Sequence, residues 1–157
     1  DEIWHRMIDI NLTGAFRTIR LCFPAMAERR FGRIINFAST AANVGYVRHS
    51  AYCASKAGLL GLTRCVALEG AEHGITCNAI NPGWVATDSN YGGCEQEIAI
   101  AGLDISVGEY RSRIAAGLPQ KRFLDPDEVA ALALFLCRDE AAGINAEDVT
   151  MAMGSLW

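Results

Sequence analysis

Apolar residues recur at intervals of three or four positions along the N-terminal segment of the chain. This spacing places them on one face of an amphipathic helix. We therefore expect a long helix over residues 2–29, with Gly14 and Pro24 weakening or kinking it. The next apolar run, residues 33–38, is short and contains two isoleucines, which predicts a buried strand.

A second long helix is predicted over residues 50–72, where small side chains are frequent. Gly58 and Gly61 lie in its interior, where each glycine costs about 1 kcal/mol relative to alanine. That cost is explained if a neighbouring backbone has to approach the helix closely. Gly74 then ends the helix, and residues 75–80 form the next strand.

The second half of the chain has a less regular pattern. Residues 84–106 show no clear periodicity and are expected to be irregular, with residues 88–93 the least ordered. Beyond them we predict a short helix over residues 110–116, a helix over 125–137 that opens with a capping aspartate and a proline, and a strand over 148–153.

Long helices that separate short buried strands indicate a parallel sheet with right-handed crossovers. The expected fold class is therefore α/β. The chain would form a partial, Rossmann-like, doubly wound parallel sheet of three strands with flanking helices, and residues 1–157 would belong to one domain.

Composition and charge argue against several classes of protein. The net charge is −4 and no basic block is present, which argues against nucleic acid as a partner. The longest apolar run, residues 129–137, is far shorter than the roughly 20 residues of a membrane span. Six cysteines lack metal-ligand spacing and fall in apolar segments, so we expect reduced thiols, no metal site and a cytoplasmic setting.

The sharpest chemical signal is Tyr52 followed by Lys56, because residues four apart share one face of a helix. A phenol is a poor acid at neutral pH, and a cation within about 4–6 Å lowers a phenol's pKa by roughly 1–3 units. Such a pair suits acid–base work on an alcohol or ketone. The plainer interpretation is a Tyr–Lys pair on a solvated helix face.

Polar residues at the ends of two predicted strands support the chemical interpretation. Ser39 follows the first strand, and Asn81-Pro82-Gly83 follows the second, with Thr87 four residues later. Because ligands bind at the carboxyl edge of open α/β sheets, these residues and Tyr52 are expected to meet in one crevice.

Four stretches together resemble the short-chain dehydrogenase/reductase family over essentially the whole chain. They are Asn11 to Gly14 (NLTG), Gly32 to Ser39 (GRIINFAS), Tyr52 to Lys56 (YCASK) and Asn81 to Thr87 (NPGWVAT). The gap between tyrosine and lysine is three residues, unlike the longer gap of bacterial enoyl reductases. The resemblance implies an NAD(P)-dependent oxidoreductase for a small-molecule secondary alcohol or ketone, most similar to hydroxyacid and ketoacyl-type reductases.

The resemblance also implies a role for each matching residue. Tyr52 would be the general acid in reduction and the base in oxidation, while Lys56 would lower its pKa and bind the nicotinamide ribose. Ser39 would hold the substrate oxygen, and Asn11 would position a water in a proton relay to Lys56. The nicotinamide side of NAD or NADP would be contacted by Tyr52, Lys56, Pro82, Gly83, Val85 and Thr87, and residues 88–118 would form a substrate lid.

Each of these residues also has a plainer interpretation. Ser39 is then a strand-end hydroxyl, Asn11 a solvent-facing helix residue and Thr87 a helix cap or turn residue. Trp84 and Tyr91 either line a substrate pocket or pack within the lid. His49 and His73 are expected to be surface residues.

The family's phosphate-binding features are not in this sequence. A glycine-rich turn after a first strand and an Asn-Asn-Ala-Gly-like run are both missing, and Asp1 is not an initiator methionine. The chain is therefore expected to be the C-terminal half of a longer domain that lacks about 90 upstream residues, at about 30 per βα unit. Such a chain alone would leave an open strand edge and bind NAD(H) weakly or not at all.

Two functions remain open at this point. The first is the oxidoreductase that the resemblance implies, and the alternative is a catalytically inactive module that serves in oligomer assembly. A homo-oligomer, either dimer or tetramer, is expected in both cases, because the family's two long helices commonly form a four-helix contact between subunits.

Overall fold

The computed structural model describes residues 1–156, and it shows an α/β fold built on one parallel sheet. The strands are β1 (Gly32–Phe37), β2 (Ile75–Pro82) and β3 (Asp148–Met151). They lie in the order β1-β2-β3, with Gly32 opposite Ile75 and Ala79 opposite Asp148. The predicted three-stranded parallel sheet is confirmed.

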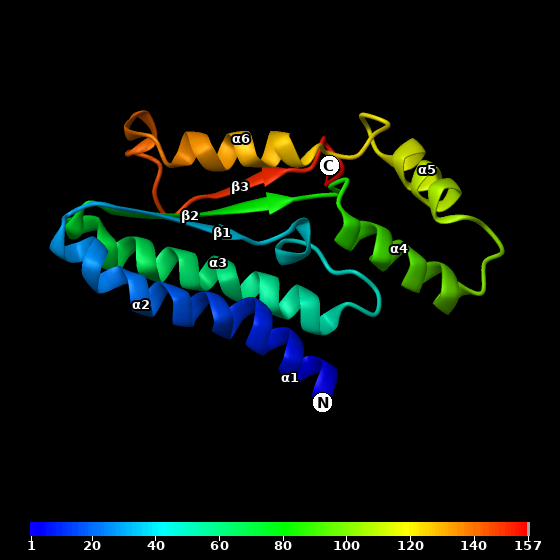
Figure 1. The fold of residues 1–157 in the computed structure, drawn as a ribbon, viewed down its shortest axis with the longest axis horizontal. Coiled ribbons are helices and arrows are strands. Elements are labelled where there is room, and N and C mark those ends of the chain that lie inside the picture. The colour runs from blue at the N-terminus through cyan, green and yellow to red at the C-terminus, as the bar shows by residue number, and fades with distance from the viewer. Residues whose placement is uncertain (157) are drawn as a thin grey trace.

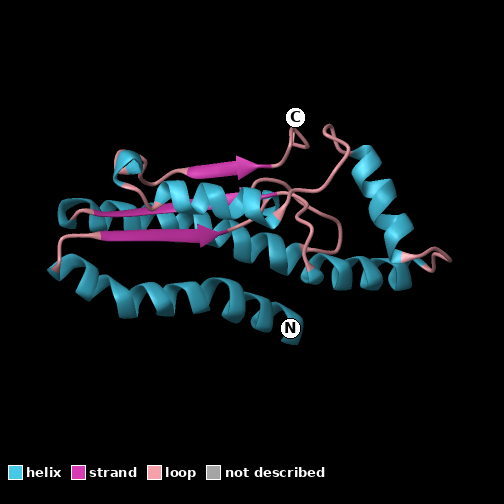
Figure 2. Cartoon of the chain, turned by 45° about the horizontal axis from the view of Figure 1, so that its top comes forward, coloured by secondary structure: helices cyan, strands magenta, loops and turns pink. Residues whose placement is uncertain are grey.

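Helices cover both faces of this sheet, as expected of a doubly wound architecture (Figures 1 and 2). The helices are α1 (Glu2–Ile8), α2 (Gly14–Glu28), α3 (Ser50–Gly70), α4 (Asp88–Ala101), α5 (Val107–Gly117) and α6 (Pro126–Leu136). Helices α2 and α3 lie on one face and α6 lies on the other, whereas α4 and α5 lie beyond the carboxyl ends of the strands. The arrangement leaves those strand ends facing the α4–α5 arm.

Strand β2 holds the layers together because it is buried along nearly its whole length. Ile75 and Cys77 pack with Ile19 of α2 and Val66 of α3 on one face. Ile80, pointing the other way, packs with apolar residues of α6. This near-continuous apolar run is typical of a parallel strand covered on both faces.

The N-terminal helix is interrupted by a π-helical turn over Asp9–Thr13, which separates α1 from α2. The turn is marked by the Gly14 N–H, which donates to the Asp9 carbonyl five residues earlier. Pro24 lies inside α2. The expected break near Gly14 is therefore present, but it takes the form of a widened turn that contains Asn11, a kind of defect often found at functional sites.

The expected irregular segment over residues 84–106 is wrong, because α4 occupies much of it. Thr87 caps this helix by accepting a hydrogen bond from the Asn90 N–H, and Gly102 ends it in a left-handed conformation at φ 62°. The prediction failed because Gly92 and Gly93 disfavour helix and because α4 buries only Cys94, so that no apolar stripe marks it.

The two glycines inside α3 differ in their surroundings. A Cβ atom on Gly58 would lie 2.7 Å from Leu12 Cδ2, whereas one on Gly61 would meet nothing within 4 Å. The expectation of a close neighbour thus holds at Gly58, although the neighbour is a side chain and not a backbone. At Gly61 the expectation is wrong, since that position faces open space.

Other features of the chain bear on its class. None of the helices in residues 1–156 combines the length and the apolarity that a membrane crossing requires. Within the same residues no three histidine, cysteine or acidic side chains gather as they would around a metal ion. All six cysteines are free thiols, and Cys77 and Cys94 are buried.

Candidate active site

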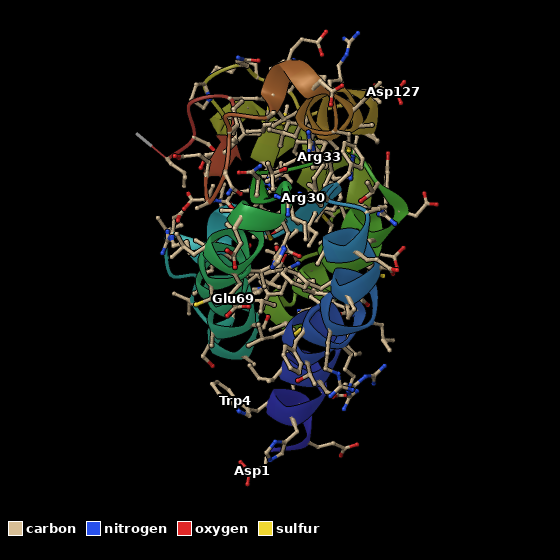
Figure 3. All side chains as sticks on the ribbon, turned by 90° about the vertical axis from the view of Figure 1, so that its left-hand side faces the viewer. Asp1, Trp4, Arg30, Arg33, Glu69 and Asp127 are labelled. Carbon is tan, nitrogen blue, oxygen red and sulfur yellow. The ribbon has the colours of Figure 1, made fainter. Side chains whose placement is uncertain are left out.

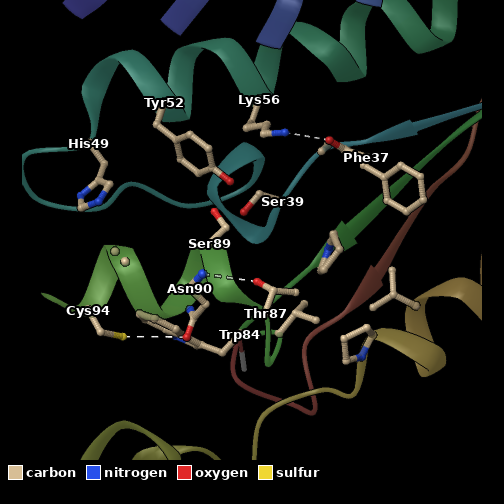
Figure 4. Close-up of a pocket in the computed structure, with 18 of the residues that line it drawn as sticks. Phe37, Ser39, His49, Tyr52, Lys56, Trp84, Thr87, Ser89, Asn90 and Cys94 are labelled. Carbon is tan, nitrogen blue, oxygen red and sulfur yellow. Dashed lines mark hydrogen bonds between the residues drawn. The ribbon is translucent and has the colours of Figure 1, made fainter. Parts of the chain in front are cut away.

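A cavity of about 1040 Å³ lies at the carboxyl ends of β1 and β2 (Figure 4). Its walls come from the end of β1, the start of α3, the segment from Pro82 into α4, and the start of α6. Ser39, Tyr52 and Lys56 all line it. Of the residues that the sequence placed in one crevice, the cavity is lined by Ser39, Tyr52, Pro82, Gly83 and Thr87. The exception is Asn81, which is fully buried within β2 and donates to Asp148 Oδ1 at 3.3 Å.

The first turns of α3 carry Tyr52 and Lys56 on the same face, as the spacing required. The Lys56 ammonium lies 5.7 Å from the centre of the Tyr52 ring and donates a 2.8 Å hydrogen bond to the Phe37 carbonyl. Partial burial lowers the pKa of Lys56 from its usual value. The bond to the end of β1 therefore fixes the ammonium beside the phenol.

Ser39 is positioned by the turn that follows β1. Its Oγ accepts a 3.1 Å hydrogen bond from the Ala41 N–H and so caps the short turn Thr40–Ala42. The Ser39 and Tyr52 hydroxyls point toward the same space, and the hydroxyl of Ser89 faces them from α4 (Figure 4). Ser39 is thus both the strand-end hydroxyl of the plainer interpretation and a wall of the cavity.

Asn11 does not line the cavity. Its side-chain amide donates 3.1 Å bonds to Ser55 Oγ and to Met7 Sδ. The Ser55 hydroxyl, fully buried, donates in turn to the Tyr52 carbonyl at 2.7 Å. Asn11 is half-buried, so the plainer interpretation of a solvent-facing residue is wrong. Asn11 is linked to the Tyr52 backbone carbonyl through Ser55.

The other four residues expected on the nicotinamide side, besides Tyr52 and Lys56, line the same cavity. Pro82 ends β2, and Gly83 packs so closely that a Cβ there would lie 3.3 Å from the Ala152 backbone. Val85 pairs with Leu124 in an isolated parallel bridge. Thr87 caps α4, as the plainer interpretation expected, and it also lines the cavity.

Trp84 and Tyr91 differ in their relation to the cavity. Trp84 lines the cavity and also stacks on Phe123 with ring centres 5.7 Å apart. Tyr91 does not line it; the Arg111 guanidinium lies 3.7 Å from its ring centre in a separate cavity of about 300 Å³.

His49 and His73 were expected at the surface, and of these two only His49 is exposed. His49 is exposed but also lines the main cavity, which the sequence did not reveal. His73 is half-buried, because its ring packs edge-on against Phe23 at 6.4 Å.

Helix α4 brings to the cavity several residues that the sequence analysis did not single out within the substrate lid expected over residues 88–118. Glu97 is the acidic one; its Oε2 accepts a 2.7 Å hydrogen bond from the Tyr110 hydroxyl of α5. This bond and the negative charge raise the pKa of Tyr110 to about 12. Two residues in the sequence could have indicated α4: Thr87, which caps its beginning, and Gly102, which ends it. The other missed cavity residues are Ser89, Asn90, Gly92, Gly93, Cys94 and Gln96.

Comparison with known proteins agrees with this geometry. The family model described as enoyl-(acyl carrier protein) reductase matches residues 1–155. D-beta-hydroxybutyrate dehydrogenase from Cupriavidus necator is 39% identical over 156 residues, which are 99% of this chain and 57% of that protein. Acetoacetyl-CoA reductase from Allochromatium vinosum is 38% identical over 138 residues, 88% of this chain and 51% of that protein.

A solved structure is also similar throughout. A variant of actinorhodin polyketide ketoreductase with NADPH superimposes with a TM-score of 0.92 at 38% identity, over 98% of this chain and 59% of that one. The chain therefore spans between half and three-fifths of the length of these proteins. Since the family model covers all but the last two residues, and fold and sequence agree along the whole match, this chain belongs to the short-chain dehydrogenase/reductase family.

Proposed function

We propose that this chain carries the proton-transfer site of an NAD(P)-dependent oxidoreductase that interconverts a secondary alcohol and a ketone. The observation that supports it most is the meeting of Ser39, Tyr52 and Lys56 on one cavity at the carboxyl edge of the sheet. The three-residue gap between tyrosine and lysine favours carbonyl over enoyl reduction.

In ketone reduction the Tyr52 hydroxyl gives its proton to the carbonyl oxygen, and in alcohol oxidation the phenolate takes it back. Lys56 lines the same cavity with its ammonium 5.7 Å from the centre of the Tyr52 ring, and its proposed role is to hold the cofactor beside the phenol. The Ser39 hydroxyl orients the substrate oxygen toward the phenol. When bound, the nicotinamide supplies or accepts the hydride at the carbon.

The residues present suit the nicotinamide end of such a cofactor. Lys56 uses one of its three N–H donors on the Phe37 carbonyl, which leaves two for ribose hydroxyls. Pro82 and Val85 provide an apolar wall nearby. The proposal includes both NAD and NADP.

Asn11 is proposed as a positioning residue. Through Ser55 it supports the backbone carbonyl of Tyr52, and we propose that it also orders a water in a relay toward Lys56. Asn11 lies in the π-helical turn between α1 and α2, and its bond to Ser55 joins that turn to α3.

The substrates proposed for the site are 3-oxo and 3-hydroxy acyl compounds. The names of the relatives include both a β-hydroxy acid and an acetoacetyl thioester, which share an oxygen at the third carbon. We further propose that residues 1–157 form the C-terminal, substrate-side part of a single Rossmann-like domain that works in the cytoplasm.

A second candidate function is self-assembly through the outer helices. Several large apolar side chains of α1, α2 and α3 are exposed, among them Trp4 at 44%, Leu21 at 75% and Leu68 at 76%. Figure 3 shows Trp4 pointing away from the core. Exposed apolar surface of this kind fits a contact with further copies of the chain.

The test is a matched pair of tyrosine variants of the purified protein. NADH and NADPH binding is followed by fluorescence titration, and reduction of methyl acetoacetate by absorbance. Tyr52→Phe is expected to lower kcat by about 10²–10⁴-fold with cofactor affinity largely kept. Tyr91→Phe, outside the cavity, is the control.

Unchanged turnover in Tyr52→Phe removes the tyrosine from the mechanism. Absence of both saturable cofactor binding and turnover, in a protein that sediments as a dimer or tetramer, favours the assembly function instead.

A further inference from the structure

An acidic side chain shares the space in which the reacting carbonyl would lie. Glu97 of α4 lines the main cavity and also the smaller space of about 190 Å³ that adjoins it. Ser39 and Tyr52 line the same two spaces. A substrate whose oxygen sits between those two hydroxyls therefore has the Glu97 carboxylate as a near neighbour.

Glu97 is held in place without being neutralised by a cation. The Tyr110 hydroxyl donates to it at 2.7 Å, so the carboxylate acts as an acceptor. In residues 1–156 no lysine, arginine or histidine lies within ion-pair distance of it. Its negative charge therefore acts on whatever occupies the cavity.

The nearby cations are engaged elsewhere. Lys56 donates to the Phe37 carbonyl, and under the proposed function its two remaining N–H donors bind the cofactor ribose. The Arg111 guanidinium donates to Asn90 Oδ1 and stacks against the rings of Tyr91 and Phe123, and Arg111 is not part of the cavity wall.

His49 is the remaining basic group on the wall. Its Nδ1 lies 2.9 Å from the Val47 carbonyl, and because a carbonyl only accepts, this nitrogen carries the proton. With Nδ1 committed to that carbonyl, only Nε2 of His49 is left to meet a ligand. Neither Lys56 nor Arg111 is thus placed to receive a second carboxylate.

Resting on the proposed function, we infer that the substrate of this site is a neutral acyl derivative, an ester or thioester of a 3-oxo acid, and not the free 3-oxo carboxylate. In a 3-oxo acid the carboxyl carbon lies two bonds from the reacting carbon, so a free carboxylate would share the small space with Glu97. Like charges in a partly enclosed site repel each other, whereas an ester carries no charge to repel.

The experiment compares acetoacetate with its methyl ester at saturating NADPH or NADH. The kcat/KM for the ester is expected to exceed that for acetoacetate by about tenfold or more, a size typical of one like-charge contact near a protein surface. The variant Glu97→Gln keeps an acceptor for Tyr110 and is expected to bring the ester-to-acid ratio toward one.

Glu95→Gln is the matched control, because Glu95 lies on the same helix, is exposed and does not line the cavity. It should leave the ratio as it is. Equal or better use of acetoacetate by the unmodified protein overturns the inference while leaving the oxidoreductase proposal standing.

If neither ketone is reduced, the proposed function fails and binding decides the inference separately. Quenching of Trp84 fluorescence, assigned by difference from Trp84→Phe, reports occupancy of the cavity wall. Tighter binding of the ester than of acetoacetate supports the inference, and the reverse order overturns it.

Discussion

Adding one methyl group at Gly58 tests the contact between α3 and the π-helical turn. The Cβ of Gly58→Ala would lie 2.7 Å from Leu12 Cδ2 and 3.3 Å from Cδ1, both too close. Leu12 is adjacent to Asn11, so displacing the leucine also disturbs Asn11, which is linked through Ser55 to the Tyr52 carbonyl. Gly61→Ala, one helical turn later, adds the same methyl group in open space.

Two opposing effects determine how much each substitution changes the free energy of unfolding. Replacing glycine by alanine inside a helix stabilises the fold by about 1 kcal/mol at either position. At Gly58 the overpacking costs about 1–3 kcal/mol, with the lower end applying if the end of the Leu12 side chain rotates away. Gly61→Ala is therefore expected to be more stable than the parent, and Gly58→Ala less stable than Gly61→Ala by about 1–3 kcal/mol.

Urea unfolding followed by circular dichroism measures both free energies of unfolding with one protocol. A double-mutant cycle with Leu12→Ala should show favourable coupling at Gly58, because the smaller side chain makes room for the new methyl group. If Gly58→Ala gains as much stability as Gly61→Ala, the close packing of α3 against the π-helical turn is refuted.

Three further predictions concern ionisation and buried polar contacts. The Arg122 guanidinium and the Asp125 N–H lower the pKa of Glu128 from 4.5 to about 2, so this carboxylate stabilises the fold above pH 4.5 and the contribution is lost as the pH falls toward 2. Acid unfolding of Arg122→Gln should accordingly depend less on pH in that window; equal curves would contradict it. Burial raises the pKa of Cys77 to about 12, so native-state alkylation read by mass spectrometry should spare it while exposed cysteines react, and early labelling of it would count against the fold. Thr63→Val removes the hydroxyl that accepts a 2.8 Å hydrogen bond from the buried Asn36 amide, and it should lower the free energy of unfolding in urea by about 1–3 kcal/mol. An unchanged free energy of unfolding would show that this bond does not stabilise the fold.

The strands and the long helices could be predicted because their signals are local. Strand β1 is a short apolar run, and the beginning of α3 carries its tyrosine and lysine at helical spacing. Parallel topology follows from the alternation of such elements, and it places Ser39 and Tyr52 at one edge of the sheet. The candidate site could be proposed from those residues alone.

What escaped prediction depends on contacts between distant parts of the chain. Helix α4 has two adjacent glycines and almost no buried face, so the sequence pattern around Gly92 and Gly93 indicated a loop. The cavity role of Glu97 depends on the placement of α4 against the strand ends. The bond from Asn11 to Ser55 joins residues 44 positions apart, and no periodicity reports such a pairing.

The most direct measurement is a double-mutant cycle between Ser39 and Tyr52 on kcat for methyl acetoacetate. If the two hydroxyls act on one substrate oxygen, Ser39→Ala and Tyr52→Phe each lower kcat, and the double variant is no slower than the worse single variant. Losses that simply multiply, or a kcat that is unchanged in either single variant, would show that the two hydroxyls do not form one catalytic unit.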